Sequence, residues 1–314
     1  MLALILTSRL DEPGPISEGS SRMTPIEQIL THPGGAHKDE FLACSLLLAL
    51  HPVPLVRREP AAADLDNPAV AVVDVGHRHE PALGNFDHHQ LPKDHPPTCS
   101  LSLVLQHLGL YEDARQFCDW LEPAEWFDCR GPLVTAKWLG IAPEVVNQLN
   151  SPIDITLLRR FALVQALAPG QPLWEMMRMI GQDLLDYLRT MRARLEFIGQ
   201  HAEVWDLQLG GSPAKVLFLP RTDPLPDEPS LGMDPFIQSR GLTDQIIGTV
   251  YPDRRSTGYG LSRFRDNARL DFTRIAAHPE VHFAHARGFV AKTTTSDVAL
   301  LKALMVQAGV PADR

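Results

Sequence analysis

Residues 69–76 read Ala-Val-Ala-Val-Val-Asp-Val-Gly, an apolar run whose sixth residue is the carboxylate Asp74. The run is rich in β-branched residues and shows no alternation with polar ones, which is typical of a parallel strand covered on both faces. Residues 26–32 and 53–58 predict two more strands, and apolar residues at helical spacing over 38–50 predict a helix between them. The order strand, helix, strand, strand indicates an α/β protein with an open, mainly parallel sheet.

Polar side chains stand where these strands end. His32 closes the first strand and Asp74 the third, while His37 and Asp39 lie where the helix over 38–50 begins. Ligands of open α/β sheets bind beyond the carboxyl ends of the strands. We therefore expect the four side chains to meet at one rim of the sheet.

A second polar stretch, residues 85–90, reads Asn-Phe-Asp-His-His-Gln and contributes Asp87, His88 and His89. Imidazole is a good ligand for Mn, Fe, Co and Zn, and a carboxylate beside it can bind the same metal or hold the far N–H of the ring. The alternative is a solvated turn. A further carboxylate, Asp128, precedes a Gly-Pro pair and is a candidate for the same site.

Two neighbouring divalent cations need a bridging carboxylate and further nitrogen or oxygen ligands on each side. We predict that Asp74 is the bridge. His32 and His37 are expected to hold the first cation. Asp39, His88 and Asp128 are expected to hold the second.

The rest of the chain suggests two domains. We predict a flexible leader over residues 1–23, a metal-binding domain over 24–170, a connecting long helix over 171–203 and a smaller α/β domain over 204–314, with a cleft between the two domains. The elements expected after the first sheet are helices over 100–107, 112–121, 143–149, 173–201 and 296–307 and strands over 215–219, 246–251 and 281–284.

Composition narrows the function. A formal charge of -9 and a pI near 5.8 argue against a protein that grips long duplex nucleic acid, since such binding rests on many phosphate contacts. The four cysteines show no Cys-x-x-Cys spacing, which favours reduced thiols in a cytoplasmic protein. The apolar start of the chain is too short for a signal peptide, and no run reaches membrane-spanning length.

The Asp-His-His triplet, the strand-end Asp74 and the His-x-x-x-x-His-x-Asp-Glu pattern from His32 to Glu40 resemble the DHH phosphoesterase superfamily. They are most similar to its melanocyte-proliferating-gene family, in which a histidine takes the middle position of the first motif, as His37 does here. Residues 250–253 and 283–289 resemble the carboxy-terminal segments of that family.

The resemblance implies a phosphodiesterase with two Mn²⁺ ions, which Mg, Co or Zn could replace. Its relatives act as exonucleases on RNA or DNA, as oligonucleotide phosphodiesterases or as pyrophosphatases. Residue by residue, it implies that the six side chains named above are metal ligands. It further implies that His89 contacts the phosphate and that Asp87 supports the histidine pair.

The second domain is expected to supply the cation that offsets phosphoryl charge, from Arg254, Arg287 or Lys292. His285, which precedes Arg287 and Gly288 in the family-like segment, would bind the same phosphate. Basic residues over 254–274 are interleaved with Tyr251, Tyr259 and Phe264, which suggests a surface that stacks bases, and the alternative is a hairpin with solvated charges. We expect His77 and His79 to be solvent-exposed, and Glu40 to be either an outer acceptor at the site or an ordinary helix-start acid.

The predicted function is hydrolysis of phosphodiester bonds at an end of a short single-stranded RNA or DNA. Two alternatives stay open: hydrolysis of a small phosphoanhydride or nucleotide, and a protein that retains metals and binds nucleic acid or a metabolite without turnover. The sequence leaves oligomeric state open.

Overall fold

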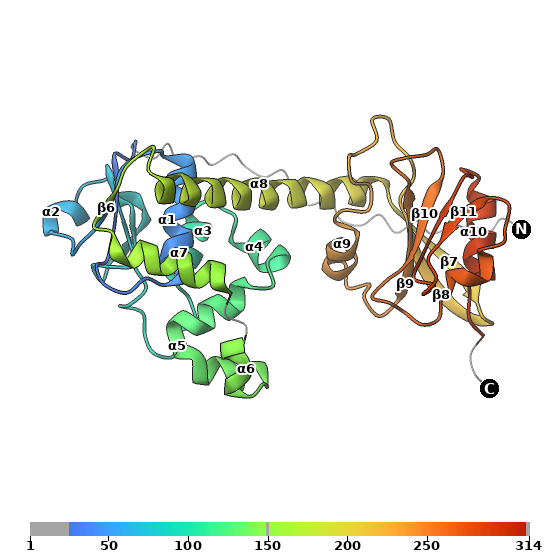
Figure 1. Ribbon diagram of the computed structural model, residues 1–314, viewed down its shortest axis with the longest axis horizontal. Coiled ribbons are helices and arrows are strands. Elements are labelled where there is room, and N and C mark those ends of the chain that lie inside the picture. The colour runs from blue at the N-terminus through green and yellow to red at the C-terminus, as the bar shows by residue number, and fades with distance from the viewer. Residues whose placement is uncertain (1–24, 149–150, 312–314) are drawn as a thin grey trace, which may run out of the picture.

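The computed structural model describes residues 25–148 and 151–311, which form two six-stranded sheets at opposite ends of one long helix (Figure 1). That helix, α8 (Pro172–His201), packs on the first sheet's helices near its start and reaches the second sheet's core at Ile198. Its bounds agree with the predicted long helix over 173–201.

The first sheet has the strand order β4-β5-β3-β1-β2-β6. The pairs β1–β2, β1–β3 and β3–β5 are parallel, and the edge strands β4 and β6 are antiparallel to their neighbours. The prediction of an open, mainly parallel sheet is therefore confirmed. The strands are β1 Gln28–Thr31, β2 Leu55–Arg57, β3 Val70–Val73, β4 His79–Glu80, β5 Asn85–Phe86 and β6 Ala166–Leu167.

Both faces of the central strands are covered, as the apolar run at residues 69–76 predicted. Ala71 and Val73 pack into the large core beneath the helices α1 (Lys38–Leu50) and α3 (Ser100–His107). Val70 and Val72 point to the other face, where Leu65 of the short α2 (Ala62–Leu65) covers them. A strand buried on both faces is fixed in register, which in turn fixes the positions of the residues at its end.

Helices α1 and α8 cross closely at Gly181. A Cβ atom placed there would lie 1.9 Å from the backbone oxygen of Ser45, so only glycine permits this approach. The crossing anchors α1, whose first turn carries Asp39, against the longest helix of the chain.

The remaining helices of this lobe are α4 (Tyr111–Phe117), α5 (Leu121–Leu139), α6 (Pro143–Gln148) and α7 (Pro152–Leu163). The helix predicted over 112–121 is wrong at its end, because α4 stops at Phe117 and Leu121 opens α5. Helix α5 is broken at Gly131, whose φ of 73° and ψ of 169° are not helical, and Pro132 follows. The Gly-Pro pair thus bends the chain just after Asp128.

The second sheet has the order β11-β12-β10-β9-β8-β7, in which β8 and β9 are parallel and the other pairs antiparallel. Sequence patterning missed β7, β10 and β12. The bounds are β7 Glu203–Leu209, β8 Ser212–Phe218, α9 Met233–Ser239, β9 Ile246–Pro252, β10 Tyr259–Arg263, β11 Val281–Ala284, β12 Val290–Thr293 and α10 Val298–Gln307, with 3-10 turns at Pro81–Leu83 and Phe272–Ile275.

The leader predicted for residues 1–23 lies outside the described residues. The division into domains stays a prediction. In the part of the chain that is described, no helix combines the length and the apolar character that crossing a bilayer requires.

Candidate metal centre

The carboxyl ends of β1, β3 and β5 lie side by side and bring three functional segments to one rim. The chain leaves β3 at Asp74, whose backbone N–H donates to the Phe86 carbonyl at 3.0 Å. Asp74 has a φ of 57°, a left-handed conformation that is uncommon outside glycine and is held here by the flanking strands. At this position the Asp74 carboxylate lies within ion-pair distance of His32 and His88.

The ligand atoms of four side chains converge on Asp74 and Asp128. His88 Nε2 lies 3.1 Å from Asp74 Oδ1 and 3.0 Å from Asp128 Oδ2. His32 Nε2 lies 3.5 Å from Asp74 Oδ2, and His37 Nδ1 lies 3.8 Å from Asp128 Oδ1. Asp39 joins His37 and Asp128 in a group whose ligand atoms are within 4.8 Å of one another. The structure thus brings together all six side chains that the sequence singled out as metal ligands.

Among the described residues, three buried atoms of this cluster have no hydrogen-bond partner: Asp39 Oδ1, Asp74 Oδ1 and His88 Nε2. The last two lie 3.1 Å apart, within ion-pair distance. Unpaired buried polar atoms cost folding free energy and are rare unless an ion or a water satisfies them. Oxygen and imidazole nitrogen are the donors that Mn²⁺, Fe²⁺, Co²⁺ and Zn²⁺ accept, so the donor set fits divalent cations.

The electrostatics of the cluster reflect crowded carboxylates. Burial raises the pKa of Asp39 well above its usual value, and the neighbouring carboxylates Asp74 and Asp128 raise it further. Burial would also raise the pKa of Asp74, but His32 and His88 outweigh it and lower that pKa to about 2. Proximity to Asp74 and then Glu40 raises the pKa of His32 to about 10. A cluster of carboxylates attracts positive charge, and a divalent cation would relieve the repulsion between Asp39, Asp74 and Asp128.

Groups outside the cluster hold the ligands in place. Ser100 Oγ donates to Asp39 Oδ2 at 2.7 Å, and Glu40 accepts from Thr31 Oγ1 at 3.1 Å and contacts His32 Nε2. Of the two interpretations of Glu40 offered by the sequence, the outer acceptor is the one that these contacts support. Ligand residues held by such outer contacts keep their orientation when a metal binds.

Arg57 pins the loop between His32 and His37. Its guanidinium donates to Glu40 Oε1 at 3.0 Å and to the carbonyls of Gly34 and Gly35 at 3.3 and 2.9 Å, and it is 4% exposed. Sequence reasoning missed Arg57, although it lies at the carboxyl end of β2, the same signal that identified His32 and Asp74. Ser100 was missed for another reason, because a serine at a helix start is ordinary on its own.

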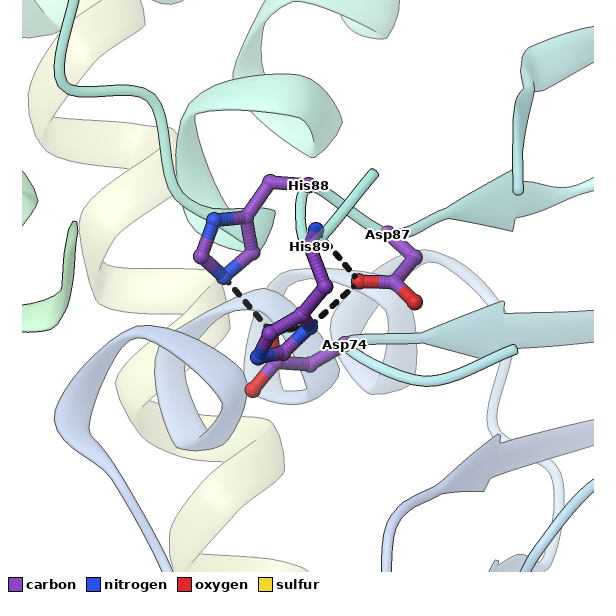
Figure 2. A group of neighbouring side chains, drawn as sticks. All are labelled: Asp74, Asp87, His88 and His89. Atoms are coloured by element: carbon purple, nitrogen blue, oxygen red, sulfur yellow. Dashed lines mark hydrogen bonds and ion pairs between the residues drawn. The ribbon is translucent and has the colours of Figure 1, made fainter. Parts of the chain in front are cut away.

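Asp87 is a buried organiser of the Asp-His-His triplet (Figure 2). It accepts from the backbone N–H of His77 at 2.6 Å and from that of His89 at 3.0 Å, and His89 Nδ1 lies 2.7 Å from it. His88 points toward Asp74, whereas His89 is half-exposed beside it. This arrangement holds the His89 imidazole at the edge of the cluster. The family resemblance implied that His89 contacts the substrate phosphate, and this role stays a prediction.

The two nearby histidines His77 and His79 are exposed, as predicted. His77 nevertheless has a φ of 52° and packs edge-on against His89, with ring centroids 6.1 Å apart.

The structure does not bring the predicted substrate-binding residues to the metal cluster. They belong to the lobe of the second sheet, at the far end of α8 (Figure 1). Arg254 and Arg287 are exposed, Lys292 donates to Asp253 at 3.1 Å, and His285 accepts from the Arg287 N–H. Gly288 has a φ of 69°. The pockets at the cluster are lined only by residues before 131, so the predicted cleft between the lobes is not observed there.

The predicted stacking of bases on Tyr259 and Phe264 is wrong. The two rings are 4% and 3% exposed and lie in the cores of the second lobe. Two nearby arginines form hydrogen bonds within the lobe: Arg269 donates to the Pro213 carbonyl at 3.0 Å and Arg274 to the Gln307 carbonyl at 3.2 Å. The alternative, a hairpin with its charges at the surface, describes this region better.

Comparisons with known proteins support the resemblance seen in the first half of the chain. Comparison with curated proteins and comparison with solved structures each found no match. Residues 28–109, which run from β1 past the end of α3 and include His32, Asp74 and the Asp-His-His triplet, match the family model MYG1_exonuc, described as uncharacterised protein family UPF0160, so the predicted family is confirmed over this stretch.

Proposed function

We propose that this protein is a metal-dependent phosphodiesterase that uses two Mn²⁺ ions to cleave nucleotides from an end of a short single-stranded RNA or DNA. The observation that carries the proposal is the convergence of six ligand side chains at one sheet rim, with three buried ligand atoms lacking hydrogen-bond partners. The abbreviation exonuc in the name MYG1_exonuc supports a nucleic-acid substrate.

His32, His37 and Asp74 would hold one cation, and Asp39, His88 and Asp128 would complete the other with Asp74 as the bridge. A pair of bound cations supplies an activated water nucleophile and offsets charge on the phosphoryl oxygens. His89, held by Asp87, is proposed to contact a phosphoryl oxygen at the edge of the cluster. Arg254, His285, Arg287, Gly288 and Lys292 are proposed to bind the substrate, and that role requires the second lobe to approach the cluster.

The first test addresses the metals. Purified protein saturated with Mn²⁺ and freed of excess ion is analysed for its metal content, beside an Asp74→Asn variant. Wild-type protein is expected to retain two ions per chain, and the variant to lose at least one, because Asp74 would be a ligand of both. Asp94→Asn, a change at an exposed loop acid, is the control and should retain both. Full occupancy in Asp74→Asn would contradict the assignment of the bridge.

The second test separates the proposed activity from its two alternatives. Mn²⁺-loaded protein is incubated with an end-labelled short RNA, with the DNA of the same sequence and with pyrophosphate. Release of mononucleotides supports the exonuclease. Hydrolysis of pyrophosphate alone supports the small phosphoanhydride hydrolase, and binding of the oligonucleotide without cleavage supports the protein that only binds. Arg287→Ala is expected to weaken oligonucleotide binding while leaving metal content unchanged.

A further inference from the structure

Two pockets open from the metal cluster, and His89 lines both of them. The larger, of about 420 Å³, is lined on the cluster side by His32, His37 and Asp74. The smaller, of about 220 Å³, is lined by His88 and Asp128. A substrate phosphate at the cluster beside His89 would therefore have a pocket on each side of it.

The two pockets differ in charge. The larger is lined by the carboxylates of Glu59, Asp74 and Asp87, and its described lining holds no lysine or arginine. The smaller is lined by Lys93 and Arg130, and its one carboxylate belongs to the metal ligand Asp128. The two ends of a substrate would thus meet different surroundings, and of the two pockets the smaller one carries the lysine and the arginine.

The two cations of the smaller pocket are free to bind a ligand. Arg130 Nη2 donates to the His95 carbonyl at 2.6 Å, which fixes the guanidinium without neutralising its charge. Within residues 25–148 and 151–311, neither Lys93 nor Arg130 forms an ion pair with a carboxylate. Helix α5 is broken at Gly131, the next residue. Asp128 and Arg130 therefore lie just before the break, and both line the pocket.

We propose that this smaller pocket, termed the Lys93–Arg130 pocket, binds a second phosphate of the substrate, next to the phosphate held at the metals. Arginine binds phosphate oxygens through two parallel N–H groups and lysine as a point charge, and the pair gives both. The inference rests on the proposed function. If the pocket binds a second phosphate, substrates with two neighbouring phosphates should have a higher kcat/KM than substrates with one. This preference would come from the first lobe rather than from Arg287.

Cys129 provides a way to observe the pocket without turnover. It lines the pocket and is partly exposed, whereas Cys44, Cys99 and Cys118 are buried. Burial raises the pKa of Cys118 to about 11 and the pKa of the other two well above the usual value, so these thiols react slowly. Iodoacetamide followed by peptide mapping should therefore label Cys129 first.

The experiment measures the alkylation rate of Cys129 in Mn²⁺-loaded protein with methylene bisphosphonate, which has two phosphonates and is not hydrolysed, or with inorganic phosphate. The bisphosphonate is expected to slow labelling about tenfold more than phosphate does, a ratio in the range of one charge-assisted contact. Lys93→Ala and Arg130→Gln should each remove this difference. Lys137→Ala, an exposed lysine on the same helix outside the pocket, should preserve it.

The kinetic counterpart compares a dinucleoside monophosphate with the same dinucleotide carrying a terminal phosphate. The ratio of their kcat/KM values should fall about tenfold in Lys93→Ala and stay unchanged in Lys137→Ala. Equal protection by phosphate and bisphosphonate, a Cys129 that does not label in the free protein, or an unchanged ratio in Lys93→Ala overturns the proposal. Failure of the proposed function would instead appear as no turnover of either substrate, with the protection experiment still giving a result.

Discussion

At the scale of single residues, the site is built from side chains whose partners restrict them before any ligand arrives. Asp87 accepts three contacts around one carboxylate, and Arg57 holds Glu40 and two loop carbonyls. The residues that would contact a metal or a phosphate could be predicted from the sequence, because histidine and aspartate are unusual at the ends of strands. The residues that hold them in place, such as Ser100 and Arg57, could not be predicted, because only the fold brings a serine or an arginine to these ligands.

The first prediction concerns Asp87. Asp87→Asn keeps the shape of the side chain but offers one acceptor oxygen in place of two, so His89 and the N–H of His77 can no longer both be held. Loss of an outer partner typically costs 10–100-fold, and we expect kcat of the Mn²⁺-loaded protein to fall by about this factor. Metal content should stay at the wild-type level, measured by elemental analysis. Loss of metal with unchanged kcat per bound ion would show that Asp87 acts on the ligands instead.

At the scale of elements, long periodic patterns were predicted well and short strands were not. The helix over 38–50 was predicted at the bounds of α1, because its apolar spacing and the following prolines mark both ends. The two-residue strands β4 and β5 are too short to show periodicity in the sequence, and they exist because β5 pairs with β3 and β4 pairs with β5. Most of the candidate site was predictable despite this, because His32 and Asp74 follow β1 and β3, which the sequence predicted as strands.

The second prediction concerns the crossing of α1 and α8. Gly181→Ala forces the backbones apart, because the new Cβ would lie 1.9 Å from Ser45 O, and we expect a loss of about 2 kcal/mol or more in the free energy of unfolding. The new Cβ of Gly199→Ala, on the same helix, meets the end of the Arg240 side chain at 3.3 Å and Phe236 Cε2 at 3.5 Å, so this change should be neutral or stabilising by up to about 1 kcal/mol. Urea unfolding of both variants checks this, and equal losses would show that the crossing is not specially tight.

At the scale of the whole molecule, the chain separates a parallel sheet with a charged rim from a mostly antiparallel sheet, with α8 between them (Figure 1). The sequence predicted two sheets because its texture changes after Trp205. It did not predict their separation, since distance between lobes depends on how α8 packs and not on any local pattern. The charged rim belongs wholly to the first lobe, so metal binding should stabilise the two lobes unequally.

The third prediction tests this inequality by metal removal. Without a divalent cation the carboxylates of Asp39, Asp74 and Asp128 repel one another, and a bound ion adds RT ln(1 + [L]/Kd), about 2.7 kcal/mol at a hundredfold excess over Kd. Hydrogen exchange followed by mass spectrometry, with Mn²⁺ and with a chelator, should show stronger protection with Mn²⁺ in β1, β3 and the start of α1, and little change in β7 to β12. Asp74→Asn should lose the difference and Asp94→Asn should keep it. Equal protection of both lobes, or a Mn²⁺ effect that survives in Asp74→Asn, would contradict a metal centre confined to the rim of the first sheet.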